Sequence, residues 1–322
     1  MLKPLTFSIL RHLSDGEFHS GEAIAASLGV SRANIWYALK NVGQAGVALR
    51  RVRGRGYRLA GPIDWLDADQ VARELGEESA LFRIEILDTA DSTNTRVLDR
   101  VNAPHGLVIA AEWQLAGRGR LGRPWHSALG DALTFSLLWR FPQGAGSLAG
   151  LSLAVSVAVV RALVRAKVSG LMLKWPNDIL WRHRKLAGIL IEIAGDAVGP
   201  ASAVIGIGIN VKLSSTTKAQ IDQAAGDLGQ AGCTMKRSAL LACVLSDLAD
   251  VLRLFSVEGF GPFAPEWQRL HAYHEKRVTL KMPDGSAIAG KIAGAANDGS
   301  LMLETKSGMR RFYGGEISFR HP

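Results

Sequence analysis

The 322-residue chain has only two cysteines, Cys233 and Cys243. They form no CxxC pair, and no histidine cluster accompanies them at metal-ligand spacing. A zinc finger and a disulfide-stapled scaffold are therefore excluded. Such sparse cysteine usage is typical of a reducing compartment, and we expect a cytoplasmic protein.

The chain also lacks a recognisable secretory signal and a clear membrane span. Lys3 and Arg11 occur before any long apolar core can build. The uncharged stretch 141–160 has the length to cross a bilayer, but Pro142 and several glycines and serines interrupt it. We expect a buried helix over about 147–167 there, with basic residues in its last turns, and no membrane association.

The composition is otherwise that of a folded protein with an uneven charge. Hydrophobic residues make up 48% and charged residues 21%, which excludes a mostly disordered chain. The length predicts two or three domains. The net charge is +9, and residues 1–60 hold nine basic against three acidic side chains. A basic module attached to a more neutral body is the simplest interpretation.

Residues 1–62 have the pattern of a winged helix-turn-helix. Apolar residues at helical spacing predict a first helix, and Ser20 and Ser31 are suitable N-caps for two more, the last running to about Gly43. The apolar segments 47–52 and 57–59 flank a run of arginines and glycines, which predicts a basic hairpin, the wing.

This order of elements, together with the positive charge, predicts DNA binding. Arginine matches guanine and asparagine matches adenine, so the last helix would contact bases and the wing would contact phosphates. The aromatic pair Trp36 and Tyr37 either contacts DNA or packs between helices. The candidate DNA-binding residues are Ser31, Arg32, Asn34, Lys40, Arg51, Arg53 and Arg55.

A glycine- and arginine-rich segment, 117–125, is the most informative part of the central region. It contains GxGxxG, but arginines fill two of the three variable positions and Pro124 interrupts the place where a helix should begin, so a dinucleotide fold is disfavoured. Glycines let backbone amides approach an anion, and arginines donate forked hydrogen bonds to phosphate and carboxylate. The segment predicts an anion-binding loop, and a merely exposed flexible loop is the alternative.

Two further segments suit the same chemistry. Lys185 precedes an apolar strand, where it can bind phosphate as a point charge or can simply extend its head to solvent. The strand 204–211 carries two glycines between isoleucines, which predicts close approach of a ligand or of another backbone.

Taken in order, these segments resemble the bifunctional biotin–protein ligases that also repress biotin-synthesis genes. The resemblance covers nearly the whole chain, and the ordered set is far more specific than any one motif. Position 121 is leucine where some relatives have arginine, so the loop is less basic here. The segments that carry the resemblance are Ser92-Thr93-Asn94, Gln114, Gly117 to Arg123, Lys174 to Asp178, Lys185 to Leu190, Gly206 to Asn210 and Gly314 to Ser318.

The resemblance implies an activity and a set of site residues. Such ligases join biotin to ATP, giving biotinyl-5′-AMP and pyrophosphate, and then transfer biotin to one lysine of a biotin carboxyl carrier protein. The implied biotin-binding residues are Ser92, Thr93, Asn94, Gln114, Arg118, Gly119, Arg120 and Lys185. The implied ATP and adenylate residues are Arg118, Arg120, Arg123, Lys174, Asn177 and Asn210.

The chemistry of this reaction agrees with those residue types. A carboxylate is a poor nucleophile towards a polyanion, so Arg118, Arg120, Lys185 and Mg²⁺ would cancel the repulsion and hold an in-line geometry. A mixed anhydride hydrolyses readily, so a mobile loop that folds over it would exclude water. Asp178 either helps to hold Mg²⁺ or orders the turn that follows Lys174.

We predict an α+β multidomain protein. Residues 1–62 form the winged helix-turn-helix DNA-binding domain, 63–272 a mixed α/β catalytic domain of the biotin and lipoate ligase type, and 273–322 a small SH3-like β-barrel. The central domain would begin with a connecting helix over 63–76. His271 and His274 are expected to be surface or capping residues and not metal ligands.

The predicted function combines ligation with repression of biotin synthesis, with the adenylate as corepressor. The resemblance also implies that the bound adenylate promotes a homodimer on two-fold operator DNA. Two alternatives remain from the sequence: a transcription factor whose central domain only senses its ligand, and a lipoate–protein ligase.

Overall fold

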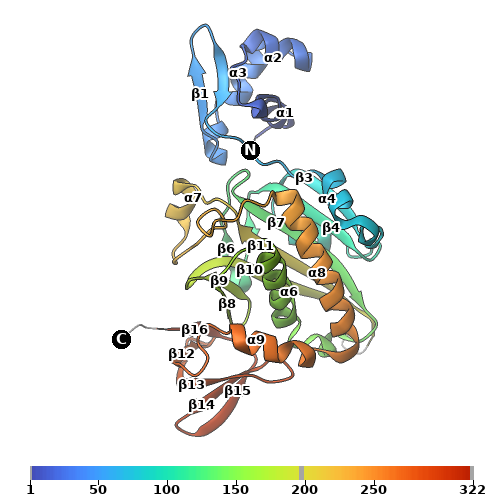
Figure 1. The fold of residues 1–322 in the computed structure, drawn as a ribbon, viewed down its shortest axis with the longest axis vertical. Helices are drawn as coiled ribbons and strands as arrows, with labels where there is room; N and C mark the ends of the chain where they lie inside the picture. The colour runs from blue at the N-terminus through green and yellow to red at the C-terminus, as the bar shows by residue number, and fades with distance from the viewer. Residues whose placement is uncertain (1, 196–198, 320–322) are drawn as a thin grey trace.

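The structure, a computed structural model, describes residues 2–195 and 199–319. A small N-terminal module lies at one end, a mixed sheet with its helices lies in the middle, and a second, smaller sheet lies at the other end (Figure 1). A segment of extended chain joins the N-terminal module to the central body.

The N-terminal module has the predicted winged helix-turn-helix architecture and its own apolar core. Ser20 and Ser31 cap their helices as predicted, since each hydroxyl accepts a hydrogen bond from the backbone amide three residues on. The last helix ends earlier than expected, because Asn41 leaves helical geometry and glycines follow. The elements are α1 (Pro4–His12), α2 (Gly21–Leu28), α3 (Arg32–Leu39), β1 (Leu49–Val52) and β2 (Gly56–Leu59).

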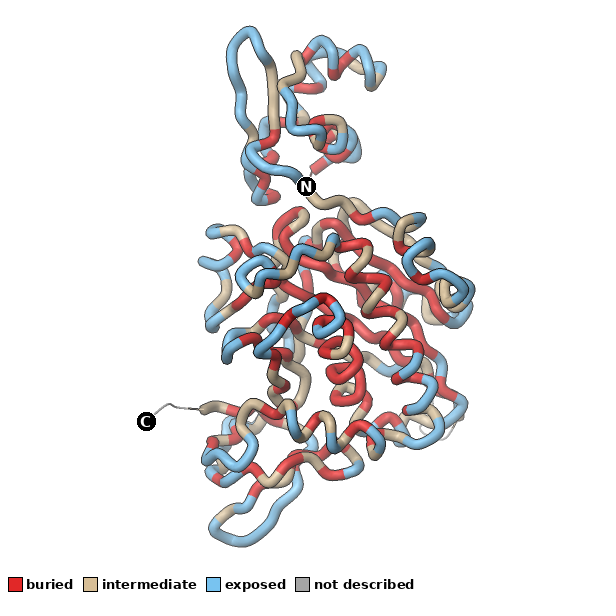
Figure 2. The backbone as a smooth tube through the Cα atoms, in the orientation of Figure 1, coloured by how far each residue is buried: buried red, intermediate tan, exposed pale blue. Residues whose placement is uncertain are grey.

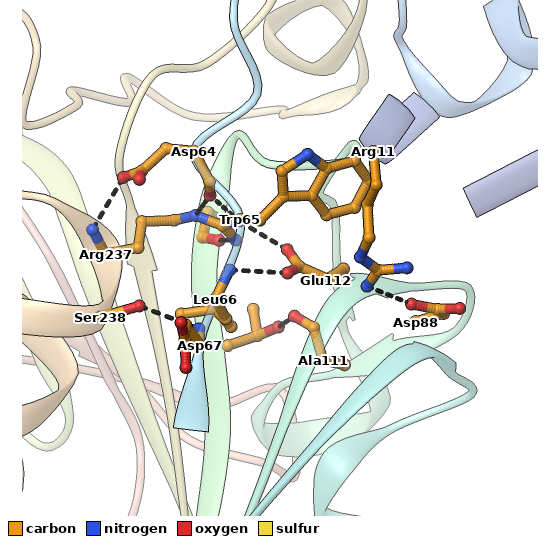
Figure 3. Close-up of polar contacts among 12 residues, drawn as sticks. Arg11, Asp64, Trp65, Leu66, Asp67, Asp88, Ala111, Glu112, Arg237 and Ser238 are labelled. Atoms are coloured by element: carbon orange, nitrogen blue, oxygen red, sulfur yellow. Dashed lines mark hydrogen bonds and ion pairs between the residues drawn. The ribbon is translucent and has the colours of Figure 1, made fainter. Parts of the chain in front are cut away.

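The connecting helix is shorter than predicted. Helix α4 (Ala68–Leu75) begins only after Asp67, whose carboxylate accepts from the Gln70 amide at 3.0 Å. Residues 63–67 are extended because the central domain takes their hydrogen bonds. The Leu66 amide donates to Glu112 Oε1 at 2.7 Å, and the Asp67 amide donates to Ser238 Oγ at 3.0 Å (Figure 3).

Seven strands form the central sheet. Only β3 and β4 run parallel to each other, and the other neighbouring pairs are antiparallel. In spatial order the strands are β3 (Arg83–Ala90), β4 (Leu107–Gln114), β7 (Ala132–Phe141), β11 (Ala201–Asn210), β10 (Arg184–Gly195), β9 (Asp178–Trp181) and β8 (Leu171–Lys174).

Alternation along the strands gives the sheet two different faces. On β11 the isoleucines 205, 207 and 209 join the main core beneath α6 (Leu151–Arg165) and α8 (Arg237–Glu258). That core is the continuous buried region of Figure 2. The intervening Gly206, Gly208 and Asn210 therefore face the other way, towards the side that α5 (Thr93–Leu98) partly covers. This second face has little apolar cover at its middle strands, which leaves room for a site.

The stretch 141–160 forms the end of β7, a short loop and most of α6, so the prediction of a buried helix is confirmed. Among the described residues, no helix is both long enough and apolar enough to cross a membrane.

The C-terminal region is a five-stranded antiparallel sheet. The segments 283–285, 297–299 and 306–307 each lie between consecutive strands. Helix α9 (Ala264–Leu270) precedes the sheet, and α7 (Ser215–Gln220) and the hairpin β5 (Gly117–Arg118) and β6 (Pro124–Trp125) complete the regular elements of the central domain. The five strands are β12 (Arg277–Lys281), β13 (Ala287–Ala295), β14 (Leu301–Thr305), β15 (Gly308–Phe312) and β16 (Glu316–Ser318).

Candidate active site

A cavity of about 780 Å³ lies over the second face of the central sheet. This volume suits a nucleotide or a small cofactor. The glycines of β10 and β11 form its floor, and residues of the C-terminal sheet contribute to its rim. It brings together every predicted biotin and ATP residue, namely Ser92, Thr93, Asn94, Gln114, Arg118, Gly119, Arg120, Arg123, Lys174, Asn177, Lys185 and Asn210, together with Asp178.

Hydrogen bonds connect the residues predicted to bind biotin. Gln114 Oε1 accepts from the Thr93 amide at 2.7 Å and from its hydroxyl at 3.1 Å. Because this oxygen is occupied, the Gln114 amide nitrogen remains as a donor. Asn94 Oδ1 accepts from Ser136 Oγ at 2.6 Å, and all four of these side chains are buried. This end of the cavity is a polar pocket in an otherwise apolar region.

The segment 117–125 is a hairpin that covers the cavity. Gly117 pairs with Trp125, and the Gly119 amide donates to the Arg123 carbonyl at 2.7 Å. At its tip Leu121 and Gly122 both have positive φ, of 55° and 72°. Leucine in that region is costly, so the tip stores strain. We call residues 117–125 the lid.

Two ion pairs connect the lid to its surroundings, one to the central sheet and one to the C-terminal sheet. Arg118 pairs with Glu192 of β10 at 3.0 Å, and Arg123 pairs with Glu316 of the C-terminal sheet. The Arg123 guanidinium holds the pKa of the Glu316 carboxyl below its usual value. Arg120 makes neither contact and lines the cavity, where burial lowers the pKa of its guanidinium, and the nearby Asp178 and Glu316 charges partly offset this. Arg120 is thus the lid cation best placed to meet an anion.

Lys185 and Asp178 form an ion pair of 2.7 Å, and both side chains are mostly buried. Lys185 is the second residue of β10, and Asp178 is the first residue of β9. The pairing of the two strands has a bulge after Lys185. The Lys185 ammonium also lies 5.9 Å from the centre of the Trp125 ring. Lys185 therefore turns into the cavity instead of extending to solvent.

Two residues predicted to bind ATP, Asn177 and Asn210, donate hydrogen bonds from their side-chain amides to backbone carbonyls. Asn177 Nδ2 donates to the Ile189 carbonyl at 2.8 Å. Asn210 Nδ2 donates to the carbonyls of Lys185 and Gly226, at 3.2 and 3.0 Å. In this state both side chains fix the strands and loop around the cavity, and only their amide oxygens remain for a ligand.

The two glycines of β11 are approached by the side chains of Asn94 and Trp125, whereas the sequence predicted the approach of a ligand or of another backbone. A Cβ atom on Gly206 would lie 2.0 Å from Asn94 Oδ1, and one on Gly208 would lie 2.5 Å from the Trp125 indole. The sequence patterns did not identify Trp125, Ser136 or Glu192. The alternation of apolar and small or polar residues on β7 and β10 is the signal by which the last two could have been found.

The predicted DNA-binding residues gather on the N-terminal module, away from the cavity (Figure 1). All of them are exposed. Arg32 pairs with Glu22 at 2.7 Å, and Arg55 stacks on Phe18 at 4.3 Å. Tyr37 is 67% exposed and Trp36 41%, in edge-to-face contact with each other, so their outward faces are not packed between helices.

His271 is the C-cap of α9, which agrees with the predicted capping role, but it is not a surface residue. Its side chain is buried and stacks on Trp267 with ring centres 4.5 Å apart, because His271 follows α9 where the helix packs against the central sheet. Burial lowers the pKa of this histidine to about 3, and the charge of His274 acts in the same direction. No group of three or more potential metal-ligating side chains occurs within 2–195 and 199–319.

A cavity with a polar pocket, a cationic lid and a lysine, in a chain that also carries a helix-turn-helix module, defines a ligand-activating enzyme joined to a transcription regulator. Comparison with known proteins agrees. Residues 87–210 match the biotin/lipoate A/B protein ligase family, 273–320 match the biotin protein ligase C terminal domain, and 6–58 match an HTH domain.

The chain belongs to the family of bifunctional biotin ligases and repressors. It is 38% identical to the bifunctional ligase/repressor BirA of Salmonella typhimurium, over 98% of this chain and 97% of that protein. It is 37% identical to that of Escherichia coli, over 96% and 95%. A biotin protein ligase from Aquifex aeolicus, solved with biotin and ATP, superposes with a TM-score of 0.64 at 29% identity, over 74% of this chain and 99% of that one. The predicted fold class and the predicted biotin ligase with a repressor module are confirmed.

Proposed function

We propose that the cavity binds biotin and ATP together and catalyses formation of biotinyl-5′-AMP. The observation that carries this proposal is the convergence of all the residues named for both substrates on one cavity of about 780 Å³. Ser92, Thr93, Asn94 and Gln114 would hold the biotin ring system in the polar pocket. Arg123, Lys174, Asn177 and Asn210 would surround the nucleotide.

In the first step a biotin carboxylate oxygen attacks the α-phosphorus of ATP, and pyrophosphate leaves. Two anions must approach each other, so the site has to supply positive charge where they meet. Lys185 and Arg120 face that space, and Arg118 lies at its edge. Their partial burial strengthens these charges relative to the same groups in water.

A Mg²⁺ ion carried by ATP needs only one or two protein carboxylates, because phosphates and water supply its other ligands. Asp178 fits this role, since its carboxylate faces the cavity beside Lys185. The ion would neutralise phosphate charge. When Asp178 turns towards it, the Lys185 ammonium is freed for the substrates.

The lid would then protect the product. A mixed anhydride reacts with water, so a hairpin that closes the cavity prolongs its life. In the second step the amine of a carrier-protein lysine attacks the acyl carbon, an amide forms and AMP leaves. We propose a biotin carboxyl carrier protein as the acceptor. No covalent enzyme intermediate is required.

The N-terminal module would bring the adenylate-bound protein to operator DNA as a homodimer. Because the module and cavity occupy separate regions, we propose functional domains of 1–62, 63–272 and 273–322. Both cysteines are free, which supports a cytoplasmic location.

An ATP–pyrophosphate exchange assay tests the proposal. Exchange should depend on biotin, and lipoate should not replace it. Biotin binding without exchange would favour a ligand-sensing transcription factor, and exchange driven by lipoate would favour a lipoate ligase.

A further inference from the structure

Glu192 contacts two walls of the cavity at once. Its side chain lies on the cavity face of β10 and is 28% exposed. One carboxylate oxygen accepts from Asn94 Nδ2 at 2.8 Å, and the same oxygen lies 3.0 Å from an Arg118 nitrogen. The Arg118 contact is a partly exposed pair, which contributes little. The contact to Asn94 is the more informative one.

Asn94 can present either its oxygen or its nitrogen to a ligand, and its surroundings decide which. Its Nδ2 meets Glu192 and, at 3.2 Å, the carbonyl of Leu190. Both partners only accept hydrogen bonds, so they select the nitrogen. The amide oxygen must then point the opposite way, where it accepts from the buried Ser136 Oγ and fills the gap above Gly206. Ser136 also lies 2.7 Å from Thr93 Oγ1 and has a single hydroxyl hydrogen, so it adapts to either amide orientation, and Glu192 and the Leu190 carbonyl are the groups that select one.

This orientation matters for the ring of biotin, which is a cyclic urea with two N–H donors and one carbonyl. An amide oxygen that accepts from Ser136 keeps a second lone pair for a ligand N–H. The reversed amide would turn its nitrogen towards the ligand N–H, so that two donors face each other and the ligand N–H is left unpaired, at a cost of about 1–3 kcal/mol.

We propose that Glu192 is a positioning residue that holds the Asn94 amide in the orientation that accepts from a urea N–H, and so sets the selectivity of the pocket. The proposal rests on the placement of biotin beside Asn94 under Proposed function. Glu192 acts through Asn94 and does not itself touch the reacting atoms.

The variant Glu192→Gln tests this role. Glutamine has the same size but can meet Asn94 with either a donor or an acceptor, so only the longer contact to the Leu190 carbonyl, at 3.2 Å, still selects the amide nitrogen. We expect the dissociation constant for biotin, measured by titration calorimetry, to rise about tenfold, which corresponds to about 1.4 kcal/mol. The KM for ATP and the melting temperature should stay at their wild-type values.

Glu85→Gln is a matched control. The Glu85 side chain is 27% exposed and pairs with Arg100, as Glu192 is 28% exposed and pairs with Arg118, but the arginine partner of Glu85 does not line the cavity. It should leave biotin affinity unchanged. Equal affinity losses in the two variants would show a general effect of removing a carboxylate and would overturn the proposal.

Two backgrounds separate the contacts of Glu192. In the Arg118→Ala background, Glu192→Gln should still weaken biotin binding about tenfold, because the contact between Glu192 and Asn94 does not depend on Arg118. In Asn94→Ala it should have no further effect, because no amide is left to orient. The opposite pattern would assign Glu192 to the lid instead. If the wild type forms no biotinyl adenylate, the proposed function fails; if it does and Glu192→Gln binds biotin normally, only the role of Glu192 fails.

Discussion

At the scale of single residues, the cavity is governed by cations that are each paired with a carboxylate. Lys185 is held by Asp178, Arg118 by Glu192 and Arg123 by Glu316. Such pairs hold the cations in place, and substrate phosphates can replace the carboxylates as their partners. Lys185 is the most buried of the three cations, so its loss should matter most.

Replacing Lys185 with alanine removes this charge from the point where the two substrate anions meet. We expect the rate of biotinyl-adenylate synthesis to fall on the order of 10²-fold or more, as for the loss of a charge-stabilising donor. Single-turnover kinetics with saturating biotin and ATP would measure it, and circular dichroism would check the fold. Adenylate synthesis at a near-normal rate would remove Lys185 from the mechanism.

His271 predicts how stability depends on pH. Its pKa is about 3 in the folded protein, against an unfolded value of 6.5, so between these values the unfolded chain binds a proton that the folded chain excludes. The contribution of neutral His271 to the unfolding free energy is fully present above pH 6.5. It decreases as the pH falls from 6.5 towards 3, by about 1.4 kcal/mol per pH unit.

The variant His271→Leu removes this titration while keeping an apolar side chain beside Trp267. Between pH 7.5 and 5 the wild type should lose about 2 kcal/mol more unfolding free energy than the variant. Urea unfolding at the two pH values would measure the difference. Parallel losses in both proteins would show that His271 is not buried in its neutral form.

At the scale of elements, the sequence predicted best where local patterns decide the structure. The serine caps of α2 and α3, the wing and the strand with alternating glycines all depend on neighbouring residues. The roles of Glu192 and Ser136 depend on which strands lie side by side, and the length of α4 depends on contacts with distant residues such as Glu112. Sequence spacing does not contain that information.

The wing carries a prediction at this scale. Arg53 and Arg55 are exposed at the tip of a two-stranded hairpin, which suits binding to phosphates better than binding to bases. Replacing both with alanine should weaken binding to many DNA sequences alike. The slope of log affinity against log salt should flatten by about one unit for each phosphate that the variant no longer neutralises.

Fluorescence anisotropy over a range of salt concentrations would measure these slopes. Arg277→Ala, which removes an exposed arginine from the C-terminal sheet, is the control and should leave the slope unchanged. An unchanged slope in the wing variant would mean that these arginines only solvate the surface.

At the scale of the whole molecule, a buried ion pair secures the connection between the two functions. Arg237 and Glu112 have fully buried side chains and contact each other and the extended segment 63–67, which we call the linker (Figure 3). Beside them Trp65 donates to Ser14 of the N-terminal module at 2.7 Å, and Arg11 pairs with Asp88 at 2.5 Å. The linker is therefore held by the central domain and contacts the DNA-binding module directly.

Replacing Arg237 with methionine would leave Glu112 buried without its cationic partner. We expect a loss of about 3–5 kcal/mol in unfolding free energy, and part of it should return when Glu112→Leu is added, because the unpaired buried charge is then removed while the carbonyls of Asp64 and Ala132 still lack their donor. Denaturant unfolding of the two single variants and the double variant would measure this coupling. Additive losses would contradict it, although Glu112 also accepts from the Leu66 amide, so full recovery is not expected.

The central claim is that the cavity makes biotinyl-5′-AMP, and mass spectrometry of the bound product tests it most directly. The purified protein would be incubated with ATP, Mg²⁺ and equal amounts of biotin and lipoate, separated from free ligands, denatured and analysed. We expect biotinyl-5′-AMP in near-stoichiometric amount, with pyrophosphate released and no lipoyl adenylate. Lipoyl-5′-AMP as the main product, or unreacted biotin and ATP alone, would contradict the claim.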